Sequence, residues 1–464
     1  MELLISSRRF RTIWMTLAGL AAAVLLGLAV ARFGPVMLAF LGGPLIGALL
    51  FYRIDLGVSA VLLTLPIEDL IPGIGSATGT RLLGMVVFAF WLVRKVLRRE
   101  SWGEILKTPL ILGSLVFLGW ATISMIWTYD RSATVLGLIT QVQLVFLTII
   151  IIDTIKTWDH VVWAARLLVL GGMIAALATM YQYFIQGVPR AGDGVSGGIN
   201  FTASSLVSIM PFAFYLIRSN HKGFWTIASL LYIPLGIVGV IVTFSRASFL
   251  LLAFVLALQA WLLFRSRSTR GIMIVLLVIM TVAAVVAVPL ERIGERMEVI
   301  TQLIESLLDP SSSDRYADDA RIYHWKVGYA MFKDSPLLGI GFNSFGQQFL
   351  TEQFEVRGMP DIFGSPRSPH SSYIGIVTEL GLVGIGIFLL ILIITARNLS
   401  AASRQLSEDN DHDRYHLVRA VYYVLVLQML YGWVLNTHLN KNFWMILGLS
   451  VTLLWLSRGQ SSDS

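Results

Sequence analysis

Residues 314–345 read DRYADDARIYHWKVGYAMFKDSPLLGIGFNSF, and residues 368–386 read SPHSSYIGIVTELGLVGIG. The first stretch is polar, whereas the second becomes an apolar run directly after His370. Apolar runs of about 17 to 25 residues recur through the rest of the chain, and each can cross the hydrocarbon core of a bilayer as a helix. The polar stretch is therefore an excursion out of the membrane, and we expect the function to be decided there.

The composition excludes a soluble globular protein. The chain has 464 residues, of which 56% are hydrophobic and 14% charged. Its formal net charge of +7 is not taken as a sign of nucleic-acid binding, because basic residues in a membrane protein mainly set topology. There is no cysteine, which excludes disulfides, a thiol nucleophile and cysteine-based metal sites. The composition predicts an all-α polytopic protein in a lipid bilayer.

Fourteen apolar runs are candidate transmembrane helices. Two of them, 35–52 and 56–71, are short and contain Pro or Gly, so the prediction is about 12–14 spans. The first run resembles a signal sequence but lacks a small-residue cleavage site, and we expect it to be an uncleaved anchor. The candidate spans are 13–31, 35–52, 56–71, 81–97, 109–128, 133–152, 162–186, 200–217, 224–243, 247–264, 271–289, 371–396, 418–435 and 442–457.

The distribution of basic residues predicts the orientation of these spans. With the N-terminus inside, 21 of the 35 Lys and Arg residues fall in short inner segments, 6 in short outer segments and 8 in the long loop. Short cytoplasmic loops are enriched in Lys and Arg, so both termini are expected inside. The long loop then faces outward, on the side of the membrane away from the cytoplasm.

Three domains are expected along the chain: an N-terminal transmembrane bundle (1–289), an extracytoplasmic helical loop (290–370) and C-terminal transmembrane helices (371–464). The loop is predicted to contain helices at 291–308, 314–334 and about 343–356, with a tight turn at Gly339 and Gly341. The Asp that opens the second helix is a candidate N-cap. The polar segment 397–417 is predicted to be a solvated connector between two spans.

His370 is the first candidate for chemistry. Only three of the seven histidines, His324, His370 and His438, fall on the outer side in this topology. His370 follows Pro369 at the point where the chain re-enters the membrane. A neutral imidazole there can accept a proton from a hydroxyl nucleophile near neutral pH. Alternatively, the ring only forms a hydrogen bond at the start of the helix, and the residues leave both roles open.

Three arginines are candidate anion-binding residues. Arg321 lies on the predicted helix 314–334 beside aromatic residues, where its planar fork suits a phosphate, although an ordinary surface ion pair with Asp318 is the simpler interpretation from the sequence alone. Arg246 lies between two apolar spans that are joined by almost no loop. Its side chain either binds an anion or extends to the membrane surface as a snorkelling anchor. Arg190 lies in the Gly-rich outer turn 187–200 and is a weaker candidate. Asp318 and Asp319 point to different faces of a helix, so no metal site is predicted.

Four stretches carry a family resemblance: PRAGDGVSGGINFTASSLVSIMPF, TFSRASFLLL, RIYHWKVGYAMFKDSPLLGIGFNSF and PHSSYIGIVTELGLVGIG. In them the chain resembles the superfamily of O-antigen ligases and Wzy-type polymerases (Wzy_C), over roughly residues 185–390. The last two stretches are the most specific. The family commonly has Asn after its histidine, whereas this chain has Ser371.

The resemblance implies a membrane glycosyltransferase with a GT-C-type helical fold. Such enzymes transfer a glycan from undecaprenyl pyrophosphate to an acceptor hydroxyl, such as that of lipid A core, by an inverting displacement without metal or other cofactor. The family's catalytic base corresponds to His370. Its pyrophosphate-binding arginines correspond to Arg246 and Arg321, with Arg190 a looser match.

Several functions remain open at the level of the sequence. A ligase, a polymerase of lipid-linked repeats and a protein glycosyltransferase share these motifs; ligase is the default. A lipid-linked oligosaccharide flippase is a more distant alternative, but transporters usually show internal repeats and ionisable residues in mid-span. A peptidoglycan polymerase uses a similar donor, yet the PLLGIG and His370 stretches argue against it.

Overall fold

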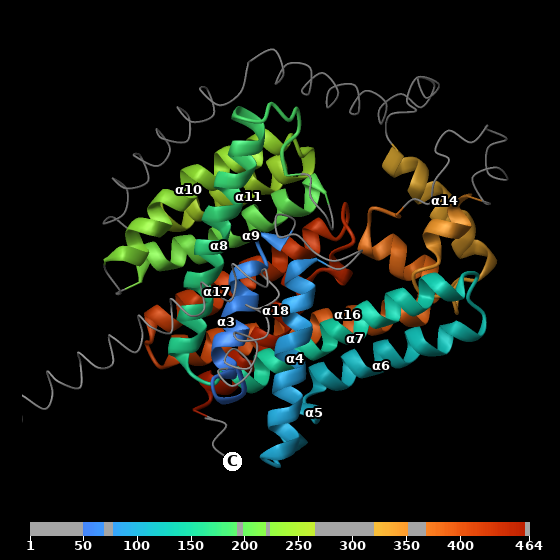
Figure 1. Cartoon of the computed structure of the whole chain (residues 1–464), viewed down its shortest axis with the longest axis horizontal. Coiled ribbons are helices and arrows are strands. Elements are labelled where there is room, and N and C mark those ends of the chain that lie inside the picture. Colours follow the sequence, from blue (N-terminus) through green and yellow to red (C-terminus); the bar gives the residue numbers. More distant parts are fainter. Residues whose placement is uncertain are drawn as a thin grey trace, which may run out of the picture.

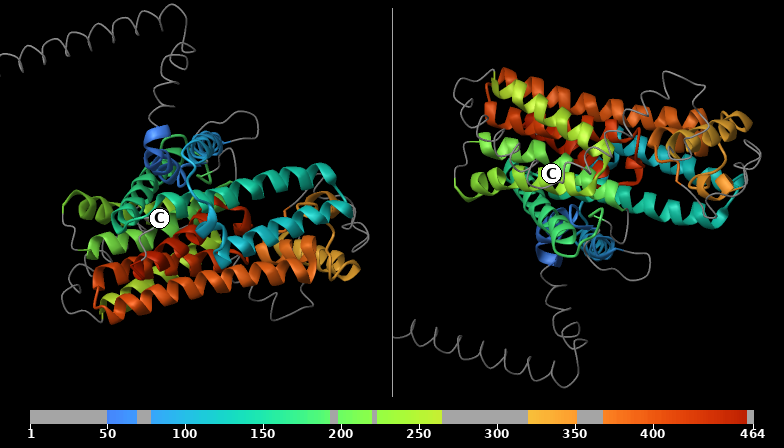
Figure 2. Two further views of the ribbon diagram at one scale, coloured as in Figure 1. Left: turned by 90° about the horizontal axis from the view of Figure 1, so that it is seen from below. Right: turned by 90° about the horizontal axis from the view of Figure 1, so that it is seen from above.

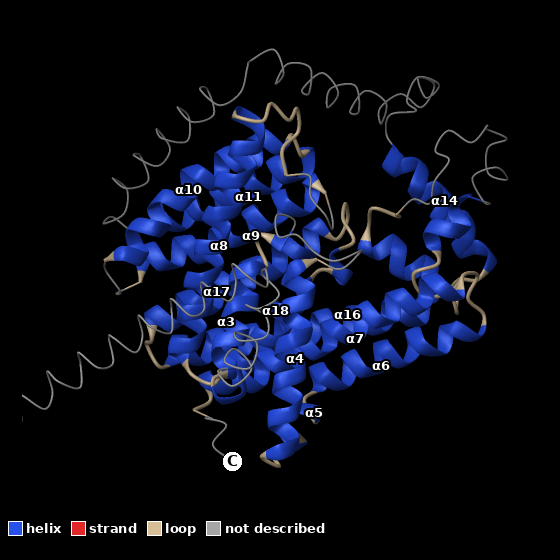
Figure 3. Cartoon of the chain, viewed as in Figure 1, coloured by secondary structure: helices blue, strands red, loops and turns tan. Residues whose placement is uncertain are grey.

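The computed structural model describes residues 50–68, 78–192, 198–219, 223–264, 320–350 and 368–459. Within these ranges the regular elements are helices (Figures 1 and 3). Six of the described helices are long and apolar enough to cross a membrane. The predicted fold class, an all-α polytopic membrane protein, is confirmed.

The longer helices follow the predicted spans closely. They are α3 (Ile54–Thr64), α4 (Gly79–Leu97), α6 (Pro109–Ile123), α7 (Arg131–Thr154), α8 (Trp158–Phe184), α9 (Ile199–Arg218), α10 (Phe224–Thr243), α11 (Arg246–Phe264), α14 (Ala320–Asp334), α16 (Ser372–Glu408), α17 (His412–Tyr431) and α18 (Lys441–Ser457).

Some predictions fall outside what the structure describes. These are the spans 13–31 and 271–289, nearly all of 35–52, the loop helix 291–308 and the N-cap at Asp314. Within the described residues, α3 is shorter than the predicted span 56–71. The second loop helix, α14, ends before Pro336 as predicted, and residues 345–350 are helical where a third loop helix was expected.

The predicted connector at 397–417 is wrong. Helix α16 continues through Glu408, and α17 begins at His412. Leu399, Ala402 and Leu406 recur at helical spacing and are buried, so this polar segment has an apolar stripe that packs on the bundle. The rest of the segment consists largely of good helix formers, which allows the long helix to continue past the apolar run.

Two groups of helices make up the bundle. Helices α6, α7 and α16 run side by side, as both Figures 1 and 2 show. The indole N–H of Trp120 on α6 donates to the carbonyl of Leu380 on α16 (3.0 Å). Thr148 on α7 donates to the carbonyl of Trp444 on α18 (3.0 Å). Such hydrogen bonds between helices supplement close packing where lipid provides little hydrophobic driving force.

The second group is organised around α9, which packs against α8, α10, α11 and α17. Of the apolar window on α9, 83% is buried, so this helix is the centre of the group. The hydroxyl of Tyr232 on α10 donates to the carbonyl of Leu206 on α9 (2.6 Å). Gln428 on α17 donates to Ser208 of α9 within this group (3.0 Å), and Asn442 on α18, which packs on α7, donates to Ser205 of α9 (3.3 Å) and so joins the two groups.

A break in α16 determines how the outer segment packs. Gly381 has φ 66° and ψ −166°, so the helix is interrupted there. A Cβ at Gly381 would lie 2.1 Å from the carbonyl oxygen of Leu337, and a Cβ at Gly339 would lie 2.3 Å from that of Glu379. The PLLGIG turn (336–341) therefore packs backbone to backbone against the break, and only glycine allows this approach.

Hydrogen bonds fix this contact. The backbone N–H groups of Ile340 and Gly341 donate to the carbonyls of Thr378 and Glu379 (3.1 and 2.9 Å). The buried Glu379 carboxylate accepts from the backbone N–H of Asn343 (2.8 Å). A buried carboxylate is tolerated when backbone donors satisfy it. The PLLGIG motif is thus a docking element that holds the segment 320–350 against α16.

Candidate functional site

His370 occupies an unusual backbone conformation directly before α16. Its φ is +49°, in the left-handed region that non-glycine residues rarely adopt. Ser371 then caps α16, its hydroxyl accepting from the backbone N–H of Ile374 (3.4 Å). The backbone N–H of His370 donates to the hydroxyl of Ser368 (3.3 Å). A strained residue that persists at a helix start is held there by its surroundings, which is typical of functional sites.

The imidazole of His370 contacts α14. It stacks on the imidazole of His324, with ring centroids 5.3 Å apart and the planes 28° from parallel. His324 is buried and meets Phe349 edge to face. The two stretches 314–345 and 368–386 therefore come together at this pair of rings.

Helix α14 also contacts α16 directly. The hydroxyl of Thr378 donates to the carbonyl of Gly328 (3.2 Å), and a Cβ at Gly328 would lie 2.9 Å from the Ile374 side chain. Arg321 lies on α14 three residues before His324, hence within one turn of the residue that His370 touches. Its side chain lies outside what the structure describes.

His370 differs from the other two outer histidines in accessibility. His324 and His438 are 2% and 3% exposed, whereas His370 is partly exposed. Burial lowers the pKa of His438 to about 3, so that ring is neutral at physiological pH. Its backbone N–H donates to the hydroxyl of Ser372 (3.2 Å), and its carbonyl accepts from the indole of Trp444 (2.7 Å). His438 is a core residue, and His370 is the one of these three histidines whose side chain is partly exposed.

Arg246 begins α11, only three residues after α10 ends. Phe244 between them is left-handed (φ 52°), which makes the reversal possible without a longer loop. Ser245 donates either to the side-chain oxygen of Asn200 (2.8 Å) or to Ser248 (3.0 Å). Among the described residues no carboxylate lies within ion-pair distance of Arg246. A guanidinium without such a carboxylate at a membrane surface is suited to an anionic ligand.

The turn that carries Arg190 lies beside the α10–α11 reversal. The backbone N–H of Ala191 donates to the carbonyl of Val242 (3.1 Å), four residues before Arg246. The next carbonyl, that of Gly192, accepts from the hydroxyl of Thr202 on α9 (2.9 Å). Arg190 itself is exposed. The structure thus brings the backbones of the Arg190 and Arg246 segments together at one end of α10.

A cavity of about 1120 Å³ lies between α3, α4, α7, α9 and α18. Phe201 and Thr202 line it on one side; they follow Asn200, the partner of Ser245, and Thr202 holds the Arg190 turn. Asn436 lines it on another side and donates to Ser368 (2.5 Å), the residue that also accepts from His370. The segments of Arg190, Arg246 and His370 are therefore hydrogen-bonded to residues that line this cavity or to their chain neighbours, although none of the three residues lines it.

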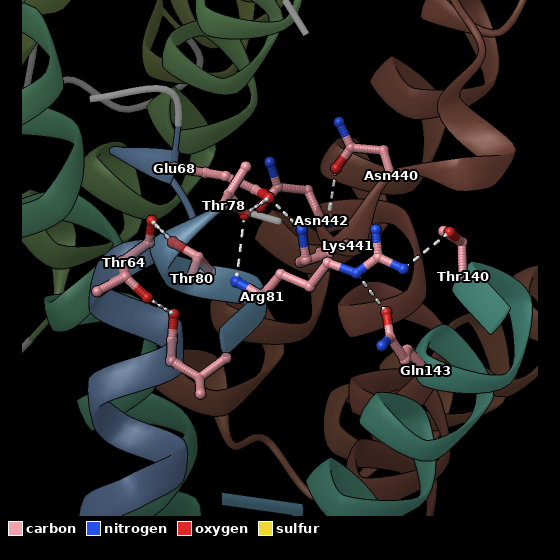
Figure 4. A network of polar contacts seen from close by, with 11 residues as sticks. Thr64, Glu68, Thr78, Thr80, Arg81, Thr140, Gln143, Asn440, Lys441 and Asn442 are labelled. Carbon is pink, nitrogen blue, oxygen red and sulfur yellow. Dashed lines mark hydrogen bonds and ion pairs between the residues drawn. The ribbon is translucent and has the colours of Figure 1, made fainter. Parts of the chain in front are cut away.

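A polar network inside this cavity was missed by the sequence analysis (Figure 4). The carboxylate of Glu68 accepts from Thr78 on one side (2.7 Å) and forms an ion pair with Lys441 at the start of α18. Arg81 donates to Gln143 (2.8 Å) and Thr140 (3.3 Å) on α7. The sequence analysis assigned Arg81 and Lys441 only to the basic residues of the outer segments. No local sequence pattern shows that helices far apart in the chain bring them to the same cavity.

The comparisons with known proteins agree with this geometry. Residues 230–389 match the family model described as O-Antigen ligase (Wzy_C). The matched segment includes Arg246, Arg321 and His370, together with the PLLGIG turn, whereas Arg190, Arg81 and Lys441 lie outside it. Among curated proteins no significant match was found. Residues 230–389 are therefore similar to the O-antigen ligase (Wzy_C) family, which confirms over this part of the chain the resemblance inferred from the sequence.

Proposed function

We propose that this protein is an O-antigen ligase-type glycosyltransferase that moves a glycan from undecaprenyl pyrophosphate to an acceptor hydroxyl. The observation that carries the proposal is the contact between His370 and His324. It joins the one partly exposed outer histidine to the helix of Arg321, and the segments of His370 and Arg246 are each hydrogen-bonded to a residue in or next to the lining of one cavity. This arrangement, within a multi-pass membrane protein whose residues 230–389 match the family, suits a lipid-linked donor.

In this mechanism His370 is the general base. Its neutral imidazole takes the proton of the acceptor hydroxyl as that oxygen attacks the anomeric carbon of the donor glycan. The bond from the anomeric carbon to the pyrophosphate oxygen breaks, and undecaprenyl pyrophosphate leaves with the electron pair. One displacement inverts the anomeric configuration. General-base catalysis contributes roughly 10²–10⁴-fold to such a step.

The arginines stabilise the leaving group. Arg246 and Arg321, with Arg190 as a further candidate, bind the pyrophosphate as its negative charge grows. Electrostatic stabilisation of this kind is usually the largest catalytic contribution, and guanidinium groups provide it through bidentate hydrogen bonds. Since the arginines neutralise the pyrophosphate, we propose a reaction without metal ion or other cofactor.

The proposal extends to location and to architecture. The basic residues of the short loops favour an active site on the periplasmic side of the inner membrane. In the GT-C-type arrangement that we propose, residues 1–289 form the lipid-facing bundle, 290–370 the extracytoplasmic loop and 371–464 the C-terminal helices. The loop and the bundle then each contribute half of the site.

The acceptor is tested by a transfer assay with purified protein. Undecaprenyl-pyrophosphate-linked glycan is incubated separately with lipid A core and with a second lipid-linked glycan. Transfer to lipid A core identifies the ligase that we propose, and elongation of the lipid-linked glycan identifies a Wzy-type polymerase instead. Movement of donor across a vesicle membrane without any transfer would overturn the proposal in favour of a flippase.

A further inference from the structure

Among the described residues that line the cavity, one cation has no carboxylate partner. Its charged lining residues are Glu68, Arg81 and Lys441. Glu68 and Lys441 neutralise each other in an ion pair with both side chains largely buried. Arg81 has no carboxylate within ion-pair distance among the described residues. Its two side-chain hydrogen bonds go to a neutral amide and a neutral hydroxyl, so the described lining residues together carry one net positive charge.

A guanidinium in such a place has unused binding capacity. The hydrogen bonds from Arg81 to Gln143 and Thr140 use two of its five N–H donors. They also fix the direction of the side chain, which in Figure 4 reaches from α4 towards α7. An ionisable group inside a membrane bundle is costly without an opposite charge, and it marks a binding site by default. The oriented fork is suited to a phosphate group.

The residues that line the cavity indicate which kind of molecule carries this phosphate. They are mainly apolar and include Phe88 and Phe146. Other wall residues, Met85 on α4 and Val135 and Ile139 on α7, are 48%, 41% and 46% exposed, so the apolar lining continues onto the lipid-facing surface of the bundle. The cavity is therefore open towards the hydrocarbon of the bilayer. A lipid tail can lie along this path with its headgroup at Arg81.

We propose that this cavity binds a phosphate-headed lipid, with Arg81 as the ligand of the phosphate that is attached to the tail. The Glu68–Lys441 ion pair joins the end of α3 to the start of α18 and shapes the headgroup side of the site. Asn436 in the cavity lining donates to Ser368, which also accepts from the backbone N–H of His370, so this side of the cavity lies near the segment of the proposed catalytic base. The identification of this lipid as the glycan donor rests on the proposed function. The inference that the lipid carries a phosphate depends on Arg81 alone.

The first experiment needs no variant. Purified protein in neutral detergent is titrated with undecaprenyl phosphate, with undecaprenol and with phosphatidylglycerol, and bound lipid is counted by native mass spectrometry. We expect the phosphate-headed lipids to bind at least about tenfold more tightly than undecaprenol, because hydrogen bonds to charged groups are worth that much. Equal affinity for undecaprenyl phosphate and undecaprenol would overturn the proposal.

The two phosphate-headed lipids identify the source of the ligand. Tighter binding of undecaprenyl phosphate than of phosphatidylglycerol supports a site for the lipid-linked donor. Equal binding of both also supports the phosphate site, and it assigns the site to bulk membrane lipid. Because these measurements involve no glycan transfer, they are independent of whether the proposed function holds.

The second experiment tests Arg81 itself. Arg81→Gln should weaken binding of undecaprenyl phosphate roughly ten- to hundredfold and leave undecaprenol binding unchanged, whereas Arg81→Lys should retain part of the affinity. The matched control is Arg94→Gln, at the other end of the same helix, where Arg94 pairs with Glu100 outside the cavity. Unchanged affinity in Arg81→Gln, or an equal loss in Arg94→Gln, would refute the assignment.

Discussion

The imidazole of His370 stacks on that of His324, with their centroids 5.3 Å apart. This contact joins residues 46 positions apart in the chain, one at the start of α16 and one in α14. It places the segment of His370 within one helical turn of Arg321, the residue to which the proposed function assigns the pyrophosphate. The predictions below test that relationship and the backbone contacts that support it.

Replacing His370 with alanine should abolish the base without unfolding the protein. We expect glycan transfer to fall by roughly 10²–10⁴-fold, the usual contribution of a general base. The measurement is the initial rate of transfer from the lipid-linked donor, with thermal unfolding as the check on folding. His412→Ala, an exposed histidine at the start of α17, is the control and should keep full activity. A fully active His370→Ala variant would rule out the base assignment.

Arg321→Lys should impair transfer even though the charge is kept. A lysine ammonium is a point charge and cannot reproduce the bidentate fork that holds a pyrophosphate, so we expect a loss of about tenfold or more in rate. Lys326→Arg on the exposed side of the same helix is the control and should be neutral. If Arg321→Lys has unchanged kinetics, Arg321 has a structural role only. Arg246→Lys is expected to behave like Arg321→Lys.

Chelation of divalent cations should leave the rate of transfer unchanged. The reason is that arginines, in our proposal, neutralise the charge of the leaving pyrophosphate. The measurement compares transfer rates after dialysis against EDTA with and without added Mg²⁺. Activity that disappears with EDTA and returns with Mg²⁺ would contradict the metal-independent mechanism.

Gly381→Ala should destabilise the fold. The new Cβ would lie 2.1 Å from the Leu337 carbonyl oxygen, and the positive φ of 66° is itself unfavourable for alanine. Backbone strain of this kind costs about 1–3 kcal/mol before any clash is added. Thermal unfolding in detergent measures the loss. Gly386→Ala in the same helix meets no atom within 4 Å and should be neutral or slightly stabilising, so equal effects of the two changes would refute this account.

Acidification should destabilise the protein through His438. Burial lowers its pKa to about 3 in the folded protein, whereas the unfolded chain has the ordinary value of about 6.5. Between these values the unfolded state binds more protons, so the free energy of unfolding decreases as the pH falls through this range. The unfolding temperature of the wild type should therefore drop more between pH 7 and pH 5 than that of His438→Gln. Parallel pH profiles would show that His438 does not contribute.

The sequence by itself predicted most of the helices and the residues of the candidate site. Apolar length and charge bias are local properties, so the spans from α4 through α11 could be read directly. His370, Arg246 and the PLLGIG turn were likewise evident from local pattern. The segment 397–417 was misjudged because its buried residues, such as Leu399 and Leu406, are apolar only at every third or fourth position.

Tertiary structure alone decided which distant residues meet. No local signal pairs Glu68 with Lys441, or brings Arg81 to Gln143, since these contacts depend on how α3, α4, α7 and α18 pack. The same holds for accessibility: His324, His370 and His438 look alike in the sequence, and packing leaves only His370 partly exposed among them. The periodicity of the sequence determines which residues form helices. Burial and cavities arise where helices pack against one another, so they follow only from the folded structure.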